Sequence, residues 1–300
     1  MIPFVRDFDF EYGVAEQVSP LIRRVVARNP GPFTFTGTGT YIVGRGQVAV
    51  IDPGPDHPDQ LDALLTATAD ERISHVFVTH THADHSPLAR PLAQRTGALV
   101  VGLPAPDAPE VGAPEAGAGL DEAHEAGFTP DIAAADGQLF SAPTWTLEAI
   151  ATPGHASNHL CYGLAQENAL FSGDHVMGWS TTVISPPHGD MGDYYASLDK
   201  IAARGFAALW PTHGPPITHV APFLAQYKLH RLAREAQILE QLRAGLSHIP
   251  DMVTAIYTDL EPRLRPAAAQ SVLAHLIHLV RAGQAACEGE PGLGAAFRAV

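Results

Sequence analysis

The stretch THTHADHS, residues 79–86, decides how the sequence is interpreted, because it places His80, His82, Asp84 and His85 within six positions. Alternate residues of an extended segment point to the same side, so His80 and His82 can share one metal ion. Asp84 and His85 follow where the chain turns, and there they can face a second ion. Imidazole and carboxylate are ligands expected of zinc. The stretch therefore predicts a metal site.

The flanking patterns place this cluster on a loop between a strand and a helix. Ser86 and Pro87 fit the N-cap and the first position of a helix over 87–97. Apolar runs and a helical pattern precede the cluster. They predict three strands, over residues 40–44, 47–52 and 74–80, and one helix, over residues 57–68.

Three further candidate ligands each follow a short apolar run. They are His155 in ATPGHASNH, Asp174 in FSGDH and His213 in WPTHG. A sheet with aligned strand ends would gather these side chains beside the first cluster. Ligand type, spacing and position after strands agree, and together they indicate a metal centre rather than scattered structural histidines.

The remaining chain is less uniform. Residues 103–137 are rich in Ala, Gly, Pro and Glu, which indicates an irregular insertion, either a lid or a mobile loop. After Pro216 the patterns predict three helices and a strand-forming tail, a module of winged-helix type. The predicted helices span residues 227–243, 250–260 and 266–283. We expect two domains, residues 1–220 and 221–300.

Composition limits the function classes. The 300 residues have 46% hydrophobic content and a formal charge of −14, which disfavours a sequence-independent grip on duplex DNA or a basic membrane contact. Residues 1–227 carry −15 of this charge and residues 228–300 carry +1. The distant Cys161 and Cys287 predict buried free thiols rather than a disulfide. The sequence contains no secretory signal or run of 18 apolar residues, which predicts a cytoplasmic protein.

The ligand pattern resembles that of the metallo-β-lactamase superfamily, H-x-H-x-D-H followed by His, Asp and His after later strands, over residues 30–220. The resemblance implies an α/β fold, an αββα sandwich with two zinc ions, or iron or manganese ions, at one edge. It assigns His80, His82 and His155 to one metal, and Asp84, His85 and His213 to the other, with Asp174 bridging them.

The resemblance also implies roles outside direct ligation. Asp52, in IDPG, would anchor the histidine loop, and Asp84 would orient the nucleophile or receive its proton. The family often has two glycines after the last histidine of the cluster, where this chain has Ser86 and Pro87. That departure concerns the shape of the loop and leaves the ligands unaffected.

The branch is indicated by STTV at 180–183, DYYASLDK at 193–200 and the C-terminal module. Together they resemble the lactamase-beta-two-like group, which includes single-stranded RNA endonucleases and carrier-protein thioesterases. The acidic first domain favours a hydrolase of a small-molecule or carrier-bound ester, thioester or amide. An RNA endonuclease is the alternative, aided if Arg263, Arg265 and Arg281 flank the cleft. A metal-bearing regulatory protein is a third reading, while glyoxalase-type and antibiotic hydrolysis fit less well.

Several other histidines carry weaker predictions. His159 is either structural or a support for the site, His175 faces away from it, and His188 is either exposed or lines the cleft. His275 and His278, one helical turn apart without a third ligand, are expected to be packing or surface residues.

We also expect the C-terminal module to close one wall of the active-site cleft, since its first helix begins soon after His213. The apolar faces predicted for its first and third helices consist of Leu229, Leu232, Ile238 and Leu239, and of Leu273, Leu276, Ile277 and Val280.

Overall fold

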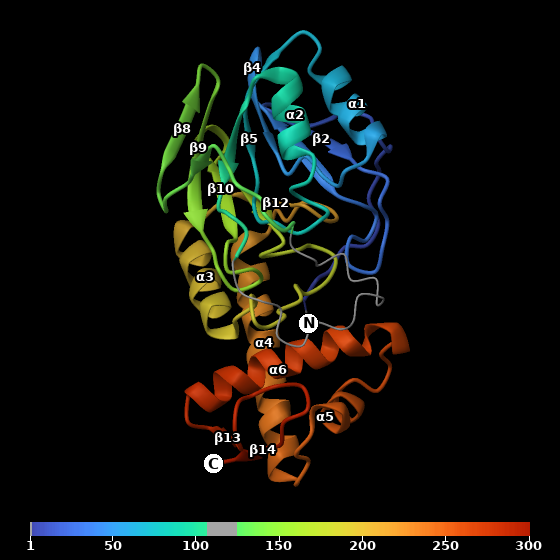
Figure 1. Cartoon of the computed structure of the whole chain (residues 1–300), viewed down its shortest axis with the longest axis vertical. Coiled ribbons are helices and arrows are strands. Elements are labelled where there is room, and N and C mark those ends of the chain that lie inside the picture. The colour runs from blue at the N-terminus through green and yellow to red at the C-terminus, as the bar shows by residue number, and fades with distance from the viewer. Residues whose placement is uncertain (1, 107–124) are drawn as a thin grey trace.

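Short runs rich in apolar and β-branched residues form two β-sheets that face each other, with helices on both outer sides (Figure 1). This computed structural model describes residues 2–106 and 125–300. Within those residues the layers follow the order helix, sheet, sheet, helix, which is the predicted αββα arrangement. The last part of the chain, residues 244–300, dark orange and red in Figure 1, lies below the sandwich.

The first sheet has the strand order β1-β2-β3-β4-β5-β6-β7 within the described residues. The strands are antiparallel from β1 to β4 and parallel from β4 to β7. Helices α1 (Pro58–Ala67) and α2 (Ala89–Thr96) cover its outer face through Leu64 and Leu92. The strands are β1 (Glu16–Ser19), β2 (Ile22–Val26), β3 (Gly39–Val43), β4 (Gln47–Ile51), β5 (Arg72–Phe77), β6 (Leu99–Gly102) and β7 (Ile132–Ala133).

The second sheet has the order β12-β11-β10-β9-β8, with β11 and β12 parallel and the other neighbours antiparallel. Its outer face is covered by α3 (Met191–Arg204) and the first half of α4 (Val220–Arg243). A 3₁₀ turn, η1 (Ala165–Glu167), joins β10 to β11. The strands are β8 (Leu139–Ala142), β9 (Trp145–Ala151), β10 (Leu160–Leu164), β11 (Ala169–Gly173) and β12 (Ala208–Pro211).

Aromatic side chains fill the space between the two sheets. Phe77 meets Tyr162 edge to face, with ring centroids 4.9 Å apart. The polar tips are satisfied: Tyr41 donates to the Pro211 carbonyl at 2.6 Å and Trp145 to the Gln47 carbonyl at 2.9 Å. Both bonds cross from one sheet to the other, so they fix the register of the sandwich as well as its spacing.

The C-terminal module contains α5 (Ile249–Ile256), the 3₁₀ turn η2 (Pro262–Leu264), α6 (Arg265–Arg281) and the hairpin β13 (Ala285–Cys287)–β14 (Phe297–Ala299). Together with α4, helices α5 and α6 and the hairpin match the three helices and strand-forming tail expected from the sequence. Helix α4 belongs to both units, because Tyr227 packs in the second-sheet core and Ile238 in the C-terminal core. The boundary between 220 and 221 therefore stays a prediction.

Some local predictions were wrong. Helix α2 begins at Ala89 with Leu88 as its N-cap, because the Ser86 hydroxyl donates to Glu125 instead of capping. Helix α4 begins at Val220 rather than 227. Leu229 and Leu232 are 63% and 42% exposed.

The insertion is also more ordered than expected where the structure describes it. Ile132–Ala133 adds a seventh strand to the first sheet, and the Glu125 amide donates to the Thr81 carbonyl at 2.6 Å. Residues 107–124 lie outside the described residues, so the choice between a lid and a loop stays open there.

Both cysteines are free thiols, with Cys161 buried and Cys287 half-buried, so the burial predicted for Cys287 was only partly correct. Among the helices that the structure describes, none combines the length and the apolar character needed to cross a bilayer. The compartment in which the protein works stays a prediction.

The turn between β3 and β4 offers a test of the sandwich packing. Gly44 and Gly46 both have positive φ angles, 97° and 71°, but only at Gly44 would a Cβ atom meet Trp145, 2.3 Å from its Cδ1. Gly46→Ala should destabilise the fold by about 1–2 kcal/mol through its backbone conformation. Gly44→Ala should lose about 1–3 kcal/mol more, because Trp145 must shift. Urea unfolding of both variants measures this difference, and equal losses would contradict it.

Candidate metal centre

The strand directions bring all seven predicted ligands to one end of the sandwich. His80, His82, Asp84 and His85 follow β5. In the second sheet, β9, β11 and β12 run in the same direction, because β10 is antiparallel to both β9 and β11 and β12 is parallel to β11. The loops after these strands carry the other three predicted ligands, His155, Asp174 and His213.

The ligand atoms form three overlapping groups, each with its atoms within 4.8 Å of one another. All members are buried. The groups are His80, His82 and His155; His80, His85 and Asp174; and Asp84, His85 and His213. The first and third groups are the two ligand sets that the family resemblance implied. Asp174 lies between them, with Oδ2 3.9 Å from His155 Nε2 and 3.5 Å from His213 Nε2.

Unpartnered polar atoms show that this cluster suits a cation. His85 Nε2, His155 Nε2 and Asp174 Oδ1 are buried and have no hydrogen-bond partner among the described residues. Burying such atoms without partners is costly. Metal coordination would satisfy all three, and imidazole nitrogen with carboxylate oxygen is a donor set for zinc and related ions. The residues present therefore fit a bound metal.

The electrostatics of the cluster also call for positive charge. Burial favours neutral side chains, yet the Asp84 and Asp52 carboxylates hold the pKa of His85 well above its ordinary value. Burial likewise opposes the protonation of His213, but Asp174 and Asp84 raise its pKa to about 10. Burial raises the pKa of Asp174, while His213 and His85 outweigh that effect and hold it well below the usual range. In the metal-free protein, protons thus supply the charge that the carboxylates require.

Asp52 supports the centre from below, as predicted. Its carboxylate accepts hydrogen bonds from the Thr79 amide and hydroxyl at 2.8 Å and from the Thr212 hydroxyl at 2.8 Å, and lies 2.9 Å from His85 Nδ1. A carboxylate on Nδ1 fixes the ring and directs Nε2 toward a metal. Asp52 itself has a positive φ of 49°, a conformation that usually persists only where its surroundings enforce it.

Backbone carbonyls orient two more ligands. His155 Nδ1 lies 2.7 Å from the Val183 carbonyl, and His213 Nδ1 lies 3.2 Å from the Gly37 carbonyl. A carbonyl oxygen only accepts, so both rings donate from Nδ1, and Nε2 of each ring would be the ligand atom once a metal is bound. The sequence motifs did not reveal these carbonyls, because a backbone acceptor has no residue-type signature.

His159 supports the site, which settles the alternatives left open for it. Its Nε2 accepts from the Asp174 amide at 3.3 Å and its Nδ1 lies 2.8 Å from the Thr152 hydroxyl. His175 is buried against Tyr194, with ring centroids 4.9 Å apart, as expected of a residue that faces away. His188 is half-buried and does not line the pocket described below.

His275 and His278 are packing residues, as expected, but a third group that was not expected accompanies them. Glu235 of α4 lies between the two rings, 3.2 Å from His275 Nδ1 and 2.9 Å from His278 Nδ1. The sequence could not reveal this contact, since Glu235 comes from a different helix. These three side chains join α4 to α6 and are not among the metal-ligand groups of the described chain.

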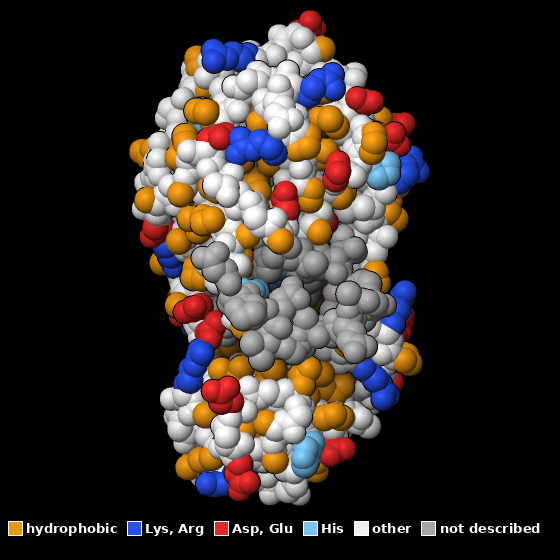
Figure 2. Space-filling view, in the orientation of Figure 1, with side chains coloured by type: hydrophobic (Ala, Val, Ile, Leu, Met, Phe, Trp, Pro, Cys, Tyr) orange, Lys and Arg blue, Asp and Glu red, His pale blue; other side chains and the backbone are white. Residues whose placement is uncertain are grey.

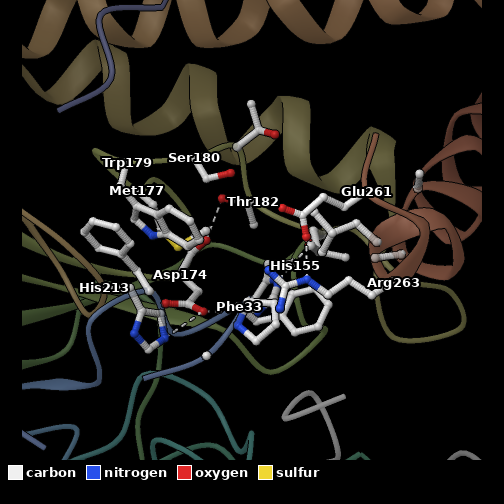
Figure 3. A pocket seen from close by; sticks show the side chains of 18 of the residues that line it. Phe33, His155, Asp174, Met177, Trp179, Ser180, Thr182, His213, Glu261 and Arg263 are labelled. Carbon is white, nitrogen blue, oxygen red and sulfur yellow. Dashed lines mark hydrogen bonds and ion pairs between the residues drawn. The ribbon is translucent and has the colours of Figure 1, made fainter. Parts of the chain in front are cut away.

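A cavity of about 500 Å³ opens onto the centre (Figure 3). One side carries Met177 and Trp179, and the other carries Glu261 and Arg263 from the C-terminal module. The lining also includes Tyr257, Leu260, Leu264, Ala267 and Ala268 of that module. The prediction that the module closes one wall of the cleft is confirmed. Figure 2 shows apolar side chains gathered on the rim of the C-terminal part that faces the sandwich.

The chain matches the family model of the metallo-beta-lactamase superfamily over residues 34–213 and that of the beta-lactamase associated winged helix domain over residues 249–293. It is 31% identical to the lactamase-like protein adaB of Aspergillus niger, over 97% of this chain and 93% of that protein. It is 35% identical to the atrochrysone carboxyl ACP thioesterase of Aspergillus chevalieri, over 76% and 68% respectively. A beta-lactamase domain protein from Burkholderia ambifaria shares the fold, with a TM-score of 0.78, 20% identity, and 98% and 96% coverage.

The support from Asp52 can be tested through metal affinity. Asp52→Asn keeps the size of the side chain but replaces one accepting oxygen with a donor, so the Thr79, His85 and Thr212 contacts cannot all be kept. Zinc affinity should fall about 10–100-fold, measured by competition with a chromophoric chelator. Asp56→Asn, in an exposed position of the same loop, is the matched control and should match the parent protein. Parental affinity in Asp52→Asn would refute the anchoring role.

Proposed function

The chain belongs to the metallo-β-lactamase superfamily and is a hydrolase with a C-terminal winged-helix domain, and from this premise we propose that it hydrolyses thioesters of bulky, apolar acyl groups at a two-metal centre. The single observation that carries the proposal is the cavity. It brings the candidate ligands His82, Asp84 and His155 together with an extended apolar surface. Cavities of about 300–1,000 Å³ are typical of small-molecule sites.

The proposed metal ligands are the seven residues that converge at the strand ends, in the two sets described above with Asp174 between them. Zinc is the ion we propose, with iron or manganese as alternatives. When bound, such ions polarise a carbonyl oxygen and lower the pKa of water, which supplies a nucleophile near neutral pH. Asp84 lines the cavity, and with metal bound its carboxylate would orient the attacking water or take up its proton.

The aromatic side of the cavity, formed by Phe35 and Trp179, favours a substrate with an apolar acyl group. Phe35 stacks on Trp179 with ring centroids 4.7 Å apart and an angle of 12° between the planes. The backbone of Phe35 has a positive φ of 56°, which is unfavourable for a bulky residue and is found most often where function requires it. Backbone bonds between Gly31 and Phe35 close the short loop that presents the ring, at 2.9 and 3.2 Å. A flat apolar group can pack against this surface.

The leaving group and the carbonyl chemistry are inferred from relatives. The thioesterase of Aspergillus chevalieri supports a thioester on a carrier, and we extend this to the present chain. An ester or amide of the same acyl group is the next candidate. A single-stranded RNA endonuclease is a second function, favoured by the presence of Arg6 and Arg263 in the cavity lining and opposed by the formal charge of −14.

Metal content and the bridging position test the centre. The purified protein should carry about two zinc, iron or manganese ions per chain, because the seven candidate ligands divide into two sets that share Asp174. Asp174→Asn should lower both metal affinity and turnover by more than about 100-fold, since it removes negative charge between two dications. Elemental analysis with a chelator titration measures the first, and thioester hydrolysis the second. Metal uptake near zero in the parent protein would refute the proposal.

Acyl specificity is tested with a series of small thioesters that differ only in the acyl group: acetyl, hexanoyl, benzoyl and naphthoyl. The value of kcat/KM should rise along the series, as apolar surface is buried. Phe35→Ala should lower kcat/KM for naphthoyl by about 10–100-fold and affect acetyl less, because removing an aromatic contact costs about 1.5–3 kcal/mol. Leu229→Ala, at an exposed position of α4, is the control. A flat series, or cleavage of single-stranded RNA instead, would count against this substrate class.

A further inference from the structure

A short segment that lines the cavity connects the C-terminal part of the chain to two candidate metal ligands. This segment, residues 180–183, follows Trp179, and we call it the strap. The Val183 carbonyl accepts from His155 Nδ1 at 2.7 Å. The Thr182 hydroxyl donates to the carbonyl of Asp174 at 2.8 Å. The position of the strap therefore determines the orientation of the His155 ring and the backbone position of Asp174.

Helix α4 holds the strap from the other side. The Tyr227 hydroxyl accepts from the Thr182 amide at 2.8 Å and donates to the Ser180 carbonyl at 2.9 Å. One helical turn further, the Arg231 guanidinium donates to the Thr182 carbonyl. Two side chains of one helix thus engage the amide and carbonyl of Thr182 and the carbonyl of Ser180.

Burying the charged side chain of Arg231 at this position costs free energy. It is only 4% exposed, and its guanidinium lies 5.4 Å from the centroid of the Tyr194 ring. Its Nε has no hydrogen-bond partner among the described residues. Burial of a charge typically costs several kcal/mol unless its bonds compensate. The carboxylate on the next turn of α4, Glu235, is engaged by His275 and His278 instead. The hydrogen bond that Arg231 donates ends on the strap, at the Thr182 carbonyl.

We propose that Arg231 and Tyr227 are positioning residues for the metal centre, acting through the strap on His155 and Asp174. Their contacts hold the Val183 carbonyl in place, and this carbonyl keeps the His155 proton on Nδ1 so that Nε2 faces the ligand cluster. The inference rests on the proposed metal function. It adds that the C-terminal part of the chain, which supplies α4, maintains the centre as well as walling the cavity.

The geometry makes the effect selective between the two ligand sets. His155 belongs to the set with His80 and His82, and its orienting bond ends on the strap. His85 and His213 are oriented from elsewhere, by Asp52 and by the Gly37 carbonyl. Loosening the strap should therefore weaken one metal position more than the other.

The experiment compares Arg231→Met, Arg231→Lys and Tyr227→Phe with Arg243→Met, an exposed arginine near the end of the same helix. Zinc titration against a chromophoric chelator gives the affinity of each position. In Arg231→Met one of the two positions should lose about 10–100-fold in affinity, with a smaller change at the other. Arg231→Lys keeps the charge and a donor and should recover part of the loss, whereas Arg243→Met should match the parent protein.

A second measurement does not depend on metal. Long-range proton–nitrogen NMR of the metal-free protein reports which nitrogen of His155 carries the proton. The parent should show Nδ1–H alone, and Arg231→Met and Tyr227→Phe should show a mixture. If Arg231→Met does not fold by circular dichroism, Tyr227→Phe carries the test. A parental tautomer in the folded variants would overturn the proposal, as would equal losses at both metal positions. If the parent protein binds no metal but the variants still show the tautomer shift, the proposed function is refuted and the positioning role is supported.

Discussion

The Asp52 carboxylate is the constraint on which the rest of the centre depends. It is 1% exposed and lies between the two sheets, where it accepts from Thr79 after β5 and from Thr212 after β12. A buried carboxylate is stable only when such donors surround it. The same group orients His85, so the arrangement that compensates the charge of Asp52 also fixes the loop that bears the histidine cluster. The packing of the two sheets and the geometry of the ligands therefore depend on the same contacts of Asp52.

The sequence could predict the ligands because each one combines a distinctive residue type with a position after an apolar run. His155, Asp174 and His213 meet because parallel strand directions bring their loops to one end, and that follows from topology. The supports were harder to foresee. The Val183 carbonyl that orients His155 has no residue signature, and Arg231 lies 49 positions from Thr182 in the sequence. Contacts of that kind depend on how α4 packs on α3 and on the strap.

Helix α4 shows why apolar periodicity misjudged the C-terminal module. Ile238 and Leu239 of the expected stripe are buried, but Leu229 and Leu232 are exposed. The polar Arg231 and Glu235 are buried instead. Hydrophobic periodicity assumes that a buried face is apolar. Here the buried face of α4 also makes polar contacts. Arg231 donates a hydrogen bond to the strap, and Glu235 contacts the two histidines of α6. A helix shared by two cores and a functional site cannot be predicted from hydrophobicity alone.

The same contacts bear on the choice between an acyl substrate and RNA. Basic residues near the site could offset the repulsion between RNA and the net negative charge of the protein, and Arg6 and Arg263 do line the cavity. Arg263 is paired with a carboxylate, since its Nε lies 2.6 Å from Glu261. Among the described residues, Arg6 Nε donates only to the Trp179 carbonyl, at 3.4 Å, so Arg6 alone keeps an uncompensated charge there. Arg265 and Arg281, which would favour RNA if they flanked the cleft, are not among the described residues that line the cavity, and Arg281 pairs with Asp190 at the start of α3. A polynucleotide needs several cations free to replace its counterions. The cavity instead offers aromatic and aliphatic surface beside the metal ligands, which suits an apolar acyl group.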